Sequence, residues 1–280
     1  MVDISAALVK ELREETNVGM MECKKALVEA GGDKAKAMKI LRERGIAVAA
    51  KKSSRAANQG LVVSALAGGG KAGALVEINC ETDFVAKNEG FKAFAAGIAE
   101  RAAASRGDVA AEVKDLVTAK IAEIGENIVF RRSVRFELQG HGRVVSYIHH
   151  GATIGVLLEC SCGKPETESS PVFQALLKDI SMHVAAAFPK YLDPASVPAP
   201  VVAAEREIFA KQVQGKPANI IEKIVDGKMR KFYEQVCLVD QAFIKDQDQT
   251  VAALVKAKSA ELGDEIAVKR FARYQVGEAI

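Results

Sequence analysis

Reactive side chains are few in this chain, and their spacing does not assemble a catalytic group. A thiol enzyme using Cys80, or Cys160 with Cys162, is one alternative, and it requires a thiol with a depressed pKa. No base that could activate such a thiol is visible beside these residues in the sequence. Cys160 and Cys162 lie two apart on a predicted strand, so their side chains share one face. The five cysteines, an odd number that also includes Cys23 and Cys237, are expected to be reduced and mostly buried.

Metal and phosphate chemistry are equally unsupported by the sequence. No pair of histidines has metal-ligand spacing supported by cysteine or carboxylate; the four are His141, His149, His150 and His183. The run Gly68-Gly69-Gly70-Lys71 lacks the GxxxxGK(S/T) spacing of a phosphate-binding loop, and Ala72 follows the lysine where that loop has Ser or Thr. We predict a hairpin turn there instead. The chain is therefore expected to hold no metal and no cofactor, and not to be an enzyme.

One loop, at residues 81–90, combines an acidic and an aromatic residue. Thr82 or Asp83 can cap a short helical turn that runs from Phe84 to Lys87. A capped turn would hold Asp83 and Phe84 rigidly at the surface, where aromatic side chains are typical binding anchors. Alternatively, Asp83 is only a cap and Phe84 folds back onto the core. The spacing alone leaves both interpretations open.

This loop interrupts an internal repeat. Residues 62–104 align without a gap onto 144–186, with 13 of 43 positions identical and none of these within the loop. A second block, 116–136, aligns onto 254–274 with 10 of 21 positions identical. The alignment offset grows from 82 to 138, so the second copy holds an insertion of 56 residues between its two blocks. A repeated framework with one divergent loop favours a shared scaffold that carries a specialised loop.

The insertion itself predicts two helices. Apolar residues recur at helical spacing in 201–214 and again in 217–237. Gly215-Lys216-Pro217 breaks the pattern, because glycine suits a helix end and proline suits a helix start. Two helices with a short connection form an antiparallel hairpin. Its apolar stripe either offers a surface for a homodimer or a 2:2 complex, or is buried between the two helices themselves.

The remaining elements predict an α+β fold. Three short helices, at 5–16, 19–30 and 34–44, form an N-terminal three-helix bundle, and the polar stretch 51–60 reads as a linker. Each repeat then has two strands, two helices and a third strand, giving a duplicated core of antiparallel sheets backed by helices, with the helical hairpin inserted in the second half. The first copy is expected at 61–66, 73–80, 90–104, 111–123 and 127–138, and the second at 143–148, 153–161, 171–187, 250–261 and 265–276. The expected domains are 1–54, 55–140, 141–187 with 238–280, and 188–237.

Composition and charge further limit the kind of protein and its expected location. The sequence is 49% hydrophobic and 27% charged, and its net charge of +3 is too small to argue for nucleic-acid or membrane binding. No segment approaches the roughly 20 apolar residues of a membrane span. The first residues enter an amphipathic helix directly, without the pattern of a signal peptide. A cytoplasmic protein is therefore expected.

Several stretches resemble one family specifically. Residues 82–87 (TDFVAK), behind the strand 75–80 (LVEINC), closely resemble the signature of the elongation factor Ts family, as do residues 19–27 (GMMECKKAL). Further similar stretches are 9–13, 124–128 with Arg131 and Arg132, 182–186, 215–217 and 276–278. The resemblance implies an N-terminal UBA-like module, a duplicated core and an inserted coiled-coil hairpin. It also implies a guanine-nucleotide exchange factor for elongation factor Tu, acting in translation elongation.

The resemblance assigns roles to particular residues. Phe84 would wedge into the GTPase domain of elongation factor Tu and displace elements that organise Mg²⁺ and the β-phosphate, while Asp83 would stabilise the displaced arrangement. The N-terminal module would grip the same domain, and the second half of the core would contact another domain. The implied contact residues are Thr82, Asp83, Phe84, Val85, Arg13, Met20, Met21, Ile124, Gly125, His150 and Ile244. Family members often continue into a further helical module after the stretch at 276–278, so its contacts are expected to be missing or reduced here.

A second alternative is a protein that binds without promoting exchange. The three-helix start resembles ubiquitin-associated bundles, which only bind their partners. The two functions differ in whether binding changes the rate of nucleotide release.

Overall fold

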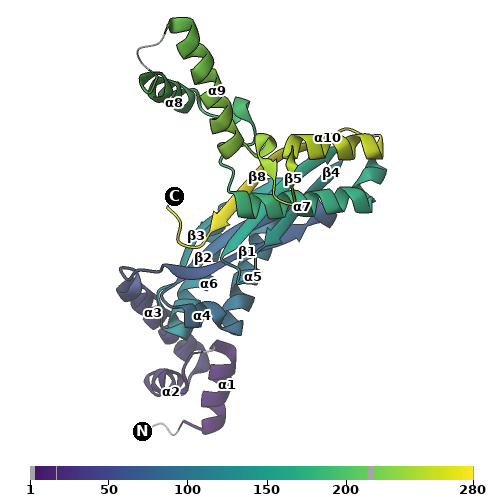
Figure 1. The fold of residues 1–280 in the computed structure, drawn as a ribbon. Coiled ribbons are helices and arrows are strands. Elements are labelled where there is room, and N and C mark those ends of the chain that lie inside the picture. Colours follow the sequence, from purple (N-terminus) through teal and green to yellow (C-terminus); the bar gives the residue numbers. More distant parts are fainter. Residues whose placement is uncertain (1–3, 17, 214–216, 280) are drawn as a thin grey trace. The chain divides into compact units, whose positions relative to one another are not determined.

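The computed structural model describes residues 4–16, 18–213 and 217–279 (Figure 1). The chain divides into two compact units. The first comprises Met1–Val63, Val76–Ser133 and Gln275–Ile280, and the second comprises Ser64–Leu75 and Val134–Tyr274. Helices accompany three small sheets, which confirms the α+β class. Within the described ranges, no helix is both long enough and apolar enough to cross a membrane.

The first unit begins with the three expected helices, α1 (Ala6–Thr16), α2 (Met20–Glu29) and α3 (Lys34–Lys52). They enclose a small core of buried side chains: Val9, Leu12, Cys23, Ala26, Leu27, Ala37 and Leu41. Asp33 caps α3, because its carboxylate accepts the Lys36 N–H at 3.0 Å. Local apolar spacing therefore predicted this part of the fold well.

Helix α3 is longer than expected, and the prediction of an end at residue 44 is wrong. The helix continues through the stretch 46–52, in which three alanines and two lysines are good helix formers. Gly45 lies where a Cβ atom would stand 3.2 Å from the Cβ of Ala122 in α6. The glycine thus allows α3 and α6 to pack closely, which offsets its low helix propensity.

The rest of the first unit contains the capped turn and two long helices. The short helix α4 (Asp83–Lys87) follows strand β2 (Ala72–Cys80), and α5 (Glu89–Ala104) and α6 (Val109–Ile124) precede strand β3 (Val129–Glu137). The first sheet has the order β1-β2-β3, with β1 at Gln59–Ala67. Its strands contribute residues to both units. Every residue of β2 is buried, so the loop after it starts from a well-packed strand.

The glycine run forms the turn between β1 and β2, as predicted. Gly68–Gly70 adopt a short 3-10 turn, η1, and all three have positive φ angles, of 58°, 65° and 92°. L-residues other than glycine rarely adopt such angles. The run therefore serves backbone geometry.

The second unit contains another three-stranded sheet with helices. Strands β4 (Gly142–Ile148), β5 (Ile154–Cys162) and β8 (Ile266–Gln275) form a sheet in the order β4-β5-β8, with β4 antiparallel to β5. Helices α7 (Pro171–Ala187) and α10 (Val251–Leu262) contribute Phe173, Leu177 and Leu254 to a core that includes Leu158 and Ile266. Three 3-10 turns also occur: η2 (Pro165–Ser169), η3 (Pro194–Ser196) and η4 (Leu238–Asp240).

A small two-stranded sheet in this unit was not predicted. It pairs β6 (Ala242–Phe243) with β7 (Asp246–Thr250). Strand β7 reads DQDQT and is largely exposed, so it lacks the alternation of apolar residues that identifies a strand. Pairing with β6 decides its conformation.

The insertion forms the expected pair of helices, α8 (Ala199–Lys211) and α9 (Ala218–Val236), seen in green in Figure 1. An ion pair of 2.8 Å joins Arg206 to Asp226 across the hairpin. Pro217 precedes the first residue of α9, whereas the predicted break at Gly215 and Lys216 lies outside the described residues. The hairpin returns to the second unit where the N–H groups of Lys190 and Tyr191 donate to the carbonyl oxygen of Val236 at 2.8 and 3.0 Å.

Candidate partner-binding site

Thr82 is the cap of the turn that follows β2. Its Oγ1 atom accepts the N–H of Val85 at 3.3 Å, and α4 begins at the next residue, Asp83. The thiol of Cys80 donates to the carbonyl oxygen of Thr82 at 3.2 Å. Of the two caps that the sequence allowed, the structure has Thr82.

Phe84 points away from the protein. Its side chain is 80% exposed, whereas Val85 is half-buried and Ala86 is buried. The alternative in which Phe84 folds back onto the core is therefore wrong. Asp83 is exposed too, and it forms an ion pair of 2.6 Å with Lys87 one turn later. The hydrogen bond from Lys87 lowers the pKa of Asp83, so this carboxylate is charged at neutral pH. A short helix thus presents a negative charge and an aromatic ring on adjacent residues.

Glu126 holds the start of this loop. Its Oε2 atom accepts the backbone N–H groups of Glu81 at 3.1 Å and Thr82 at 3.0 Å, and its Oε1 atom accepts the Thr82 hydroxyl at 2.7 Å. In return, the carboxylate of Glu81 accepts the N–H of Asn127 at 2.6 Å. Glu126 lies 44 residues from Thr82, so its role could not be read from local spacing. In the sequence, the stretch 124–128 stands out by its family resemblance and by its place in the repeated block 116–136.

The base of the loop is also joined to the end of α3. Lys52 donates to the carbonyl oxygen of Gly125, and Asn127 donates to the carbonyl oxygen of Arg55 at 2.8 Å. Arg55 also forms an ion pair with Glu81, with 3.5 Å between its Nη1 atom and Oε2 of Glu81. These contacts connect the N-terminal helices to the loop within the first unit.

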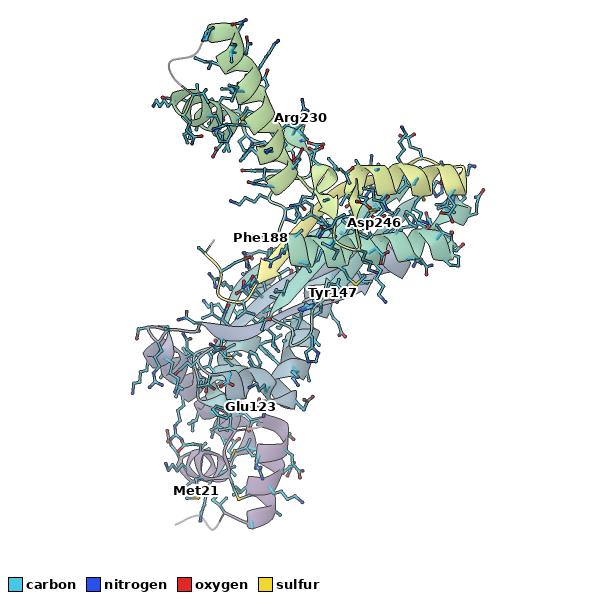
Figure 2. All side chains as sticks on the ribbon, in the orientation of Figure 1. Met21, Glu123, Tyr147, Phe188, Arg230 and Asp246 are labelled. Atoms are coloured by element: carbon cyan, nitrogen blue, oxygen red, sulfur yellow. The ribbon has the colours of Figure 1, made fainter. Side chains whose placement is uncertain are left out.

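The other expected contact residues of the first unit occupy two places. Arg13 is exposed on α1, and Met20 and Met21 are 50% and 65% exposed at the start of α2; Figure 2 labels Met21. Ile124 is half-buried at the end of α6, and Gly125 ends that helix with a φ angle of 81°. Glu126 brings the 124–125 pair next to Thr82.

His150 and Ile244, the expected contacts of the second unit, lie in turns. His150 is exposed between β4 and β5, whereas the Nδ1 atom of His149 is 3.0 Å from the Tyr147 hydroxyl. Ile244 is 39% exposed between β6 and β7, and its N–H donates to Nδ1 of the buried His183 at 3.3 Å. Since the Nε2 atom of His183 lies 2.9 Å from Oε1 of Gln241, it carries the ring proton.

Three similar proteins align with nearly the whole chain, and a family model matches most of it. The family model described as Elongation factor TS matches residues 81–278. The elongation factor Ts of Clostridium acetobutylicum is 46% identical over 291 residues, covering 99% of this chain and 94% of that protein. The elongation factors Ts of Trichlorobacter lovleyi and of a Nitratiruptor species are 44% and 45% identical, with the same coverage of each chain.

The chain belongs to the elongation factor Ts family. As a member, it is a nucleotide-exchange factor for elongation factor Tu in translation elongation, and it is not an enzyme. The cytoplasmic location expected from the sequence agrees with the place of translation. The adaptor that binds without exchange is therefore the wrong alternative.

The thiols of this elongation factor Ts also argue against the cysteine enzyme. Burial raises the pKa of Cys80 to about 12 and that of Cys237 to about 11, and it raises the pKa values of Cys160 and Cys162 as well. A catalytic thiol needs the opposite shift. All five cysteines are free and buried, in agreement with the expectation that they are reduced and mostly buried. Within the described ranges, no group of three or more His, Cys, Asp or Glu side chains is arranged to hold a metal ion.

Proposed function

We propose that α4 is the element that releases GDP, with Phe84 as the wedge and Asp83 as its polar partner. The proposal is supported by one observation above all: an aromatic ring that is 80% exposed stands on a turn capped by Thr82 and clamped by Glu126. A side chain that is already held rigidly loses little entropy on binding, so more of its contact free energy is left as affinity. Phe84 would enter the GTPase domain of elongation factor Tu near its Mg²⁺ and phosphate site.

Exchange then follows from linkage. A protein that binds nucleotide-free elongation factor Tu more tightly than the GDP-bound form must weaken GDP binding by the same factor. A thousandfold weakening corresponds to about 4 kcal/mol of coupling free energy. Displacing the groups that hold Mg²⁺ and the β-phosphate removes charge-assisted contacts to GDP, and each of these is worth about 1.5–3 kcal/mol. Loss of two or three such contacts is therefore enough for a thousandfold weakening of GDP binding.

The remaining contact residues would supply affinity. Arg13, Met20 and Met21 form the grip of a UBA-like N-terminal module, and Ile124 and Gly125 extend the surface next to Thr82. In the second unit, His150 and Ile244 would contact another domain of elongation factor Tu. His150 is better placed than His149 for this role, since Tyr147 engages the ring of His149.

We further infer that the core arose by duplication. One ion pair in it has a counterpart at the offsets of 82 and 138 found in the sequence. Arg132 pairs with Glu77, and Arg270 pairs with Glu159. The domain division at 1–54, 55–140, 141–187 with 238–280, and 188–237 follows from this origin, with the last range as a coiled-coil insertion.

The hairpin also supports a proposal on assembly. Ile208 and Ile220 are 48% and 43% exposed on α8 and α9. We propose that they form a contact in a homodimer or a 2:2 complex with elongation factor Tu. Sedimentation equilibrium of the wild type and of an Ile208→Ser, Ile220→Ser variant tests this, and equal monomer masses at all concentrations would contradict it.

Stopped-flow release of a fluorescent GDP analogue from elongation factor Tu, at fixed Mg²⁺, tests the central proposal. The wild type is expected to accelerate release by several orders of magnitude, and Phe84→Ala to lose most of this acceleration while still folding. Met38→Ala serves as a control, since Met38 is 42% exposed on α3 and is not among the proposed contacts. Full acceleration by Phe84→Ala would remove Phe84 from the mechanism.

A further inference from the structure

We propose that Glu126 is a positioning residue for nucleotide exchange, which sets the cap of α4 and so the direction of Phe84. This inference rests on the proposed role of Phe84. Glu126 touches neither the partner nor the nucleotide in this scheme, and it acts only through Thr82.

The first step of the argument concerns the Thr82 hydroxyl. That group has one proton, and Glu126 accepts it at 2.7 Å. The oxygen lone pairs therefore remain for the N–H of Val85, which donates to the same atom at 3.3 Å. A carboxylate that takes the hydroxyl proton thus orients Thr82 as an N-cap acceptor. Without Glu126, the hydroxyl can rotate and direct its proton to other acceptors. Its lone pairs are then no longer held toward the N–H of Val85, and the cap is weakened.

The second step concerns the backbone before the cap. The Glu126 carboxylate also accepts the N–H groups of Glu81 and Thr82, so it fixes two successive peptide units. Hydrogen bonds to an ionised acceptor are stronger than those between neutral groups. The helix that follows has only five residues and cannot hold its own direction, because isolated helices of this length are unstable in water. The direction of Phe84 therefore depends on its fixed start.

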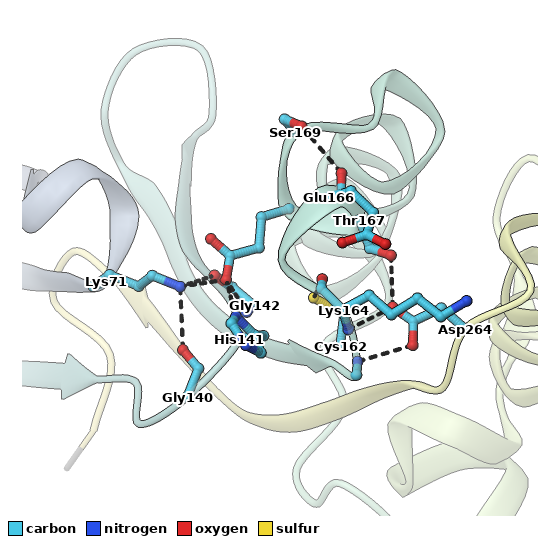
Figure 3. Close-up of polar contacts among 12 residues, drawn as sticks. Lys71, Gly140, His141, Gly142, Cys162, Lys164, Glu166, Thr167, Ser169 and Asp264 are labelled. Carbon is cyan, nitrogen blue, oxygen red and sulfur yellow. Dashed lines mark hydrogen bonds and ion pairs between the residues drawn. The ribbon is translucent and has the colours of Figure 1, made fainter.

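The second unit contains the same clamp without the wedge. Asp264, at the position equivalent to Glu126, accepts the N–H groups of Gly163 and Lys164 at 3.0 Å each (Figure 3). Its third partner is the hydroxyl of Thr167 at 2.6 Å, three residues further along its loop. Both carboxylates follow a glycine with positive φ that ends a helix, Gly125 or Gly263.

The comparison separates scaffold from function. Two backbone contacts are common to the clamps, so they belong to the shared framework. Glu126 binds both the N–H and the hydroxyl of Thr82, whereas Asp264 binds the N–H of Lys164 and the hydroxyl of a different residue, Thr167. Thr82 in turn caps the helix that carries the exposed ring of Phe84. Asp264 is thus a matched control: its loss should cost stability in the same way and leave exchange unchanged.

The experiment measures two quantities on the full chain: the maximal rate of GDP release at saturating exchange factor, and the melting temperature. Glu126→Ala is expected to lower the maximal rate about tenfold to a hundredfold, because the competent loop conformation becomes a minor state. Both alanine variants are expected to lower the melting temperature by similar amounts, but Asp264→Ala is expected to keep the wild-type rate of GDP release. Glu126→Gln is expected to lower the maximal rate by less than Glu126→Ala does, because its amide oxygen still accepts the two N–H groups whereas its NH2 group cannot accept the Thr82 hydroxyl proton.

A direct readout of the loop accompanies the rates. In Glu126→Ala, the Val85 amide should exchange its hydrogen faster than in the wild type, while amides of α5 stay protected. If Glu126→Ala does not fold, Glu126→Asp carries the test. Asp264 shows that the shorter side chain holds two backbone N–H groups in this place, so the variant should fold and still release GDP more slowly.

The outcomes separate this inference from the proposed function. Suppose that Phe84→Ala is defective in exchange. A wild-type maximal rate in Glu126→Ala then overturns the positioning role of Glu126. If Glu126→Ala does not fold, a wild-type rate in Glu126→Asp overturns it. An equal loss of rate in Asp264→Ala also overturns it, since the effect is then one of general stability. A wild-type rate in Phe84→Ala refutes the proposed function itself.

Discussion

Arg132 donates from its Nε atom to Oε2 of Glu77 at 2.7 Å, and the Glu77 side chain is fully buried. Arg270 and Glu159 make the equivalent bond at 2.8 Å in the second unit, at the offsets that relate the sequence repeats. The two pairs differ in their surroundings. Glu77 also accepts hydrogen bonds from Arg131, Asn79 and the N–H of Gly277, whereas the Arg270 side chain is 47% exposed.

This difference predicts unequal costs for the same substitution. Glu77→Gln should lower the free energy of unfolding by about 3 kcal/mol, because it removes the negative charge from a fully buried position to which two half-buried arginines donate. Glu159→Gln should cost about 1 kcal/mol, since water can solvate Arg270. Urea unfolding of both variants measures the difference. Equal losses would mean that burial of Glu77 does not govern its contribution.

Phe84 and Phe91 provide a second matched pair. Phe84 is exposed on α4, and Phe91 is fully buried on α5. Phe91→Ala should lower the free energy of unfolding by about 3–5 kcal/mol, because it leaves a cavity in the core. Phe84→Ala should change it by less than about 0.5 kcal/mol, as surface substitutions do. Thermal unfolding followed by circular dichroism checks both, and a large loss in Phe84→Ala would show that the ring packs on the protein.

Glu168 makes stability depend on pH in acid. The hydrogen bond from Lys71, 2.5 Å long, lowers the pKa of Glu168 to about 2, with help from the N–H of Gly142 and from His141 (Figure 3). A pKa lower in the folded than in the unfolded state stabilises the protein above the unfolded pKa, near 4.3. This contribution is lost as the pH falls from about 5 to 2.

Glu168→Gln tests this dependence. At pH 7 the variant should be less stable by about 1–2 kcal/mol, since the Lys71 pair is partly solvated. The difference from the wild type should shrink as the pH falls toward 2. Glu166→Gln, at an exposed neighbouring carboxylate, is the control and should follow the wild type. Urea unfolding at several pH values measures the stability difference between Glu168→Gln and the wild type. A difference that persists at pH 2 would contradict the assignment of this pH dependence to Glu168.

The hairpin should be removable. Its buried side chains, Val225 and Met229, are not members of the core cluster of the second unit. Replacing residues 201–233 with a Gly-Ser linker keeps Val236, whose carbonyl oxygen binds the N–H groups of Lys190 and Tyr191. We expect cooperative unfolding with a melting temperature within a few degrees of the wild type. Calorimetry measures it, and loss of the cooperative transition would make the hairpin part of the core.

The sequence by itself determined the order and type of most elements. Apolar spacing and the internal repeat located the helices and long strands, because these depend on periodicities of 3.6 and 2 residues that survive in any one segment. The same spacing marked Thr82 as a cap candidate and Asp83 with Phe84 as the residues to consider. It did not decide whether Phe84 faces the core or the solvent.

Only the tertiary structure decided that question, and the reason is distance along the chain. The clamp on Thr82 comes from Glu126, 44 residues away, and the residue that approaches α3 closely at Gly45 is Ala122, far along the chain. Strand β7 likewise owes its conformation to its pairing with β6. Local periodicity carries no record of such contacts, because the free energy that selects them arises only when remote segments meet.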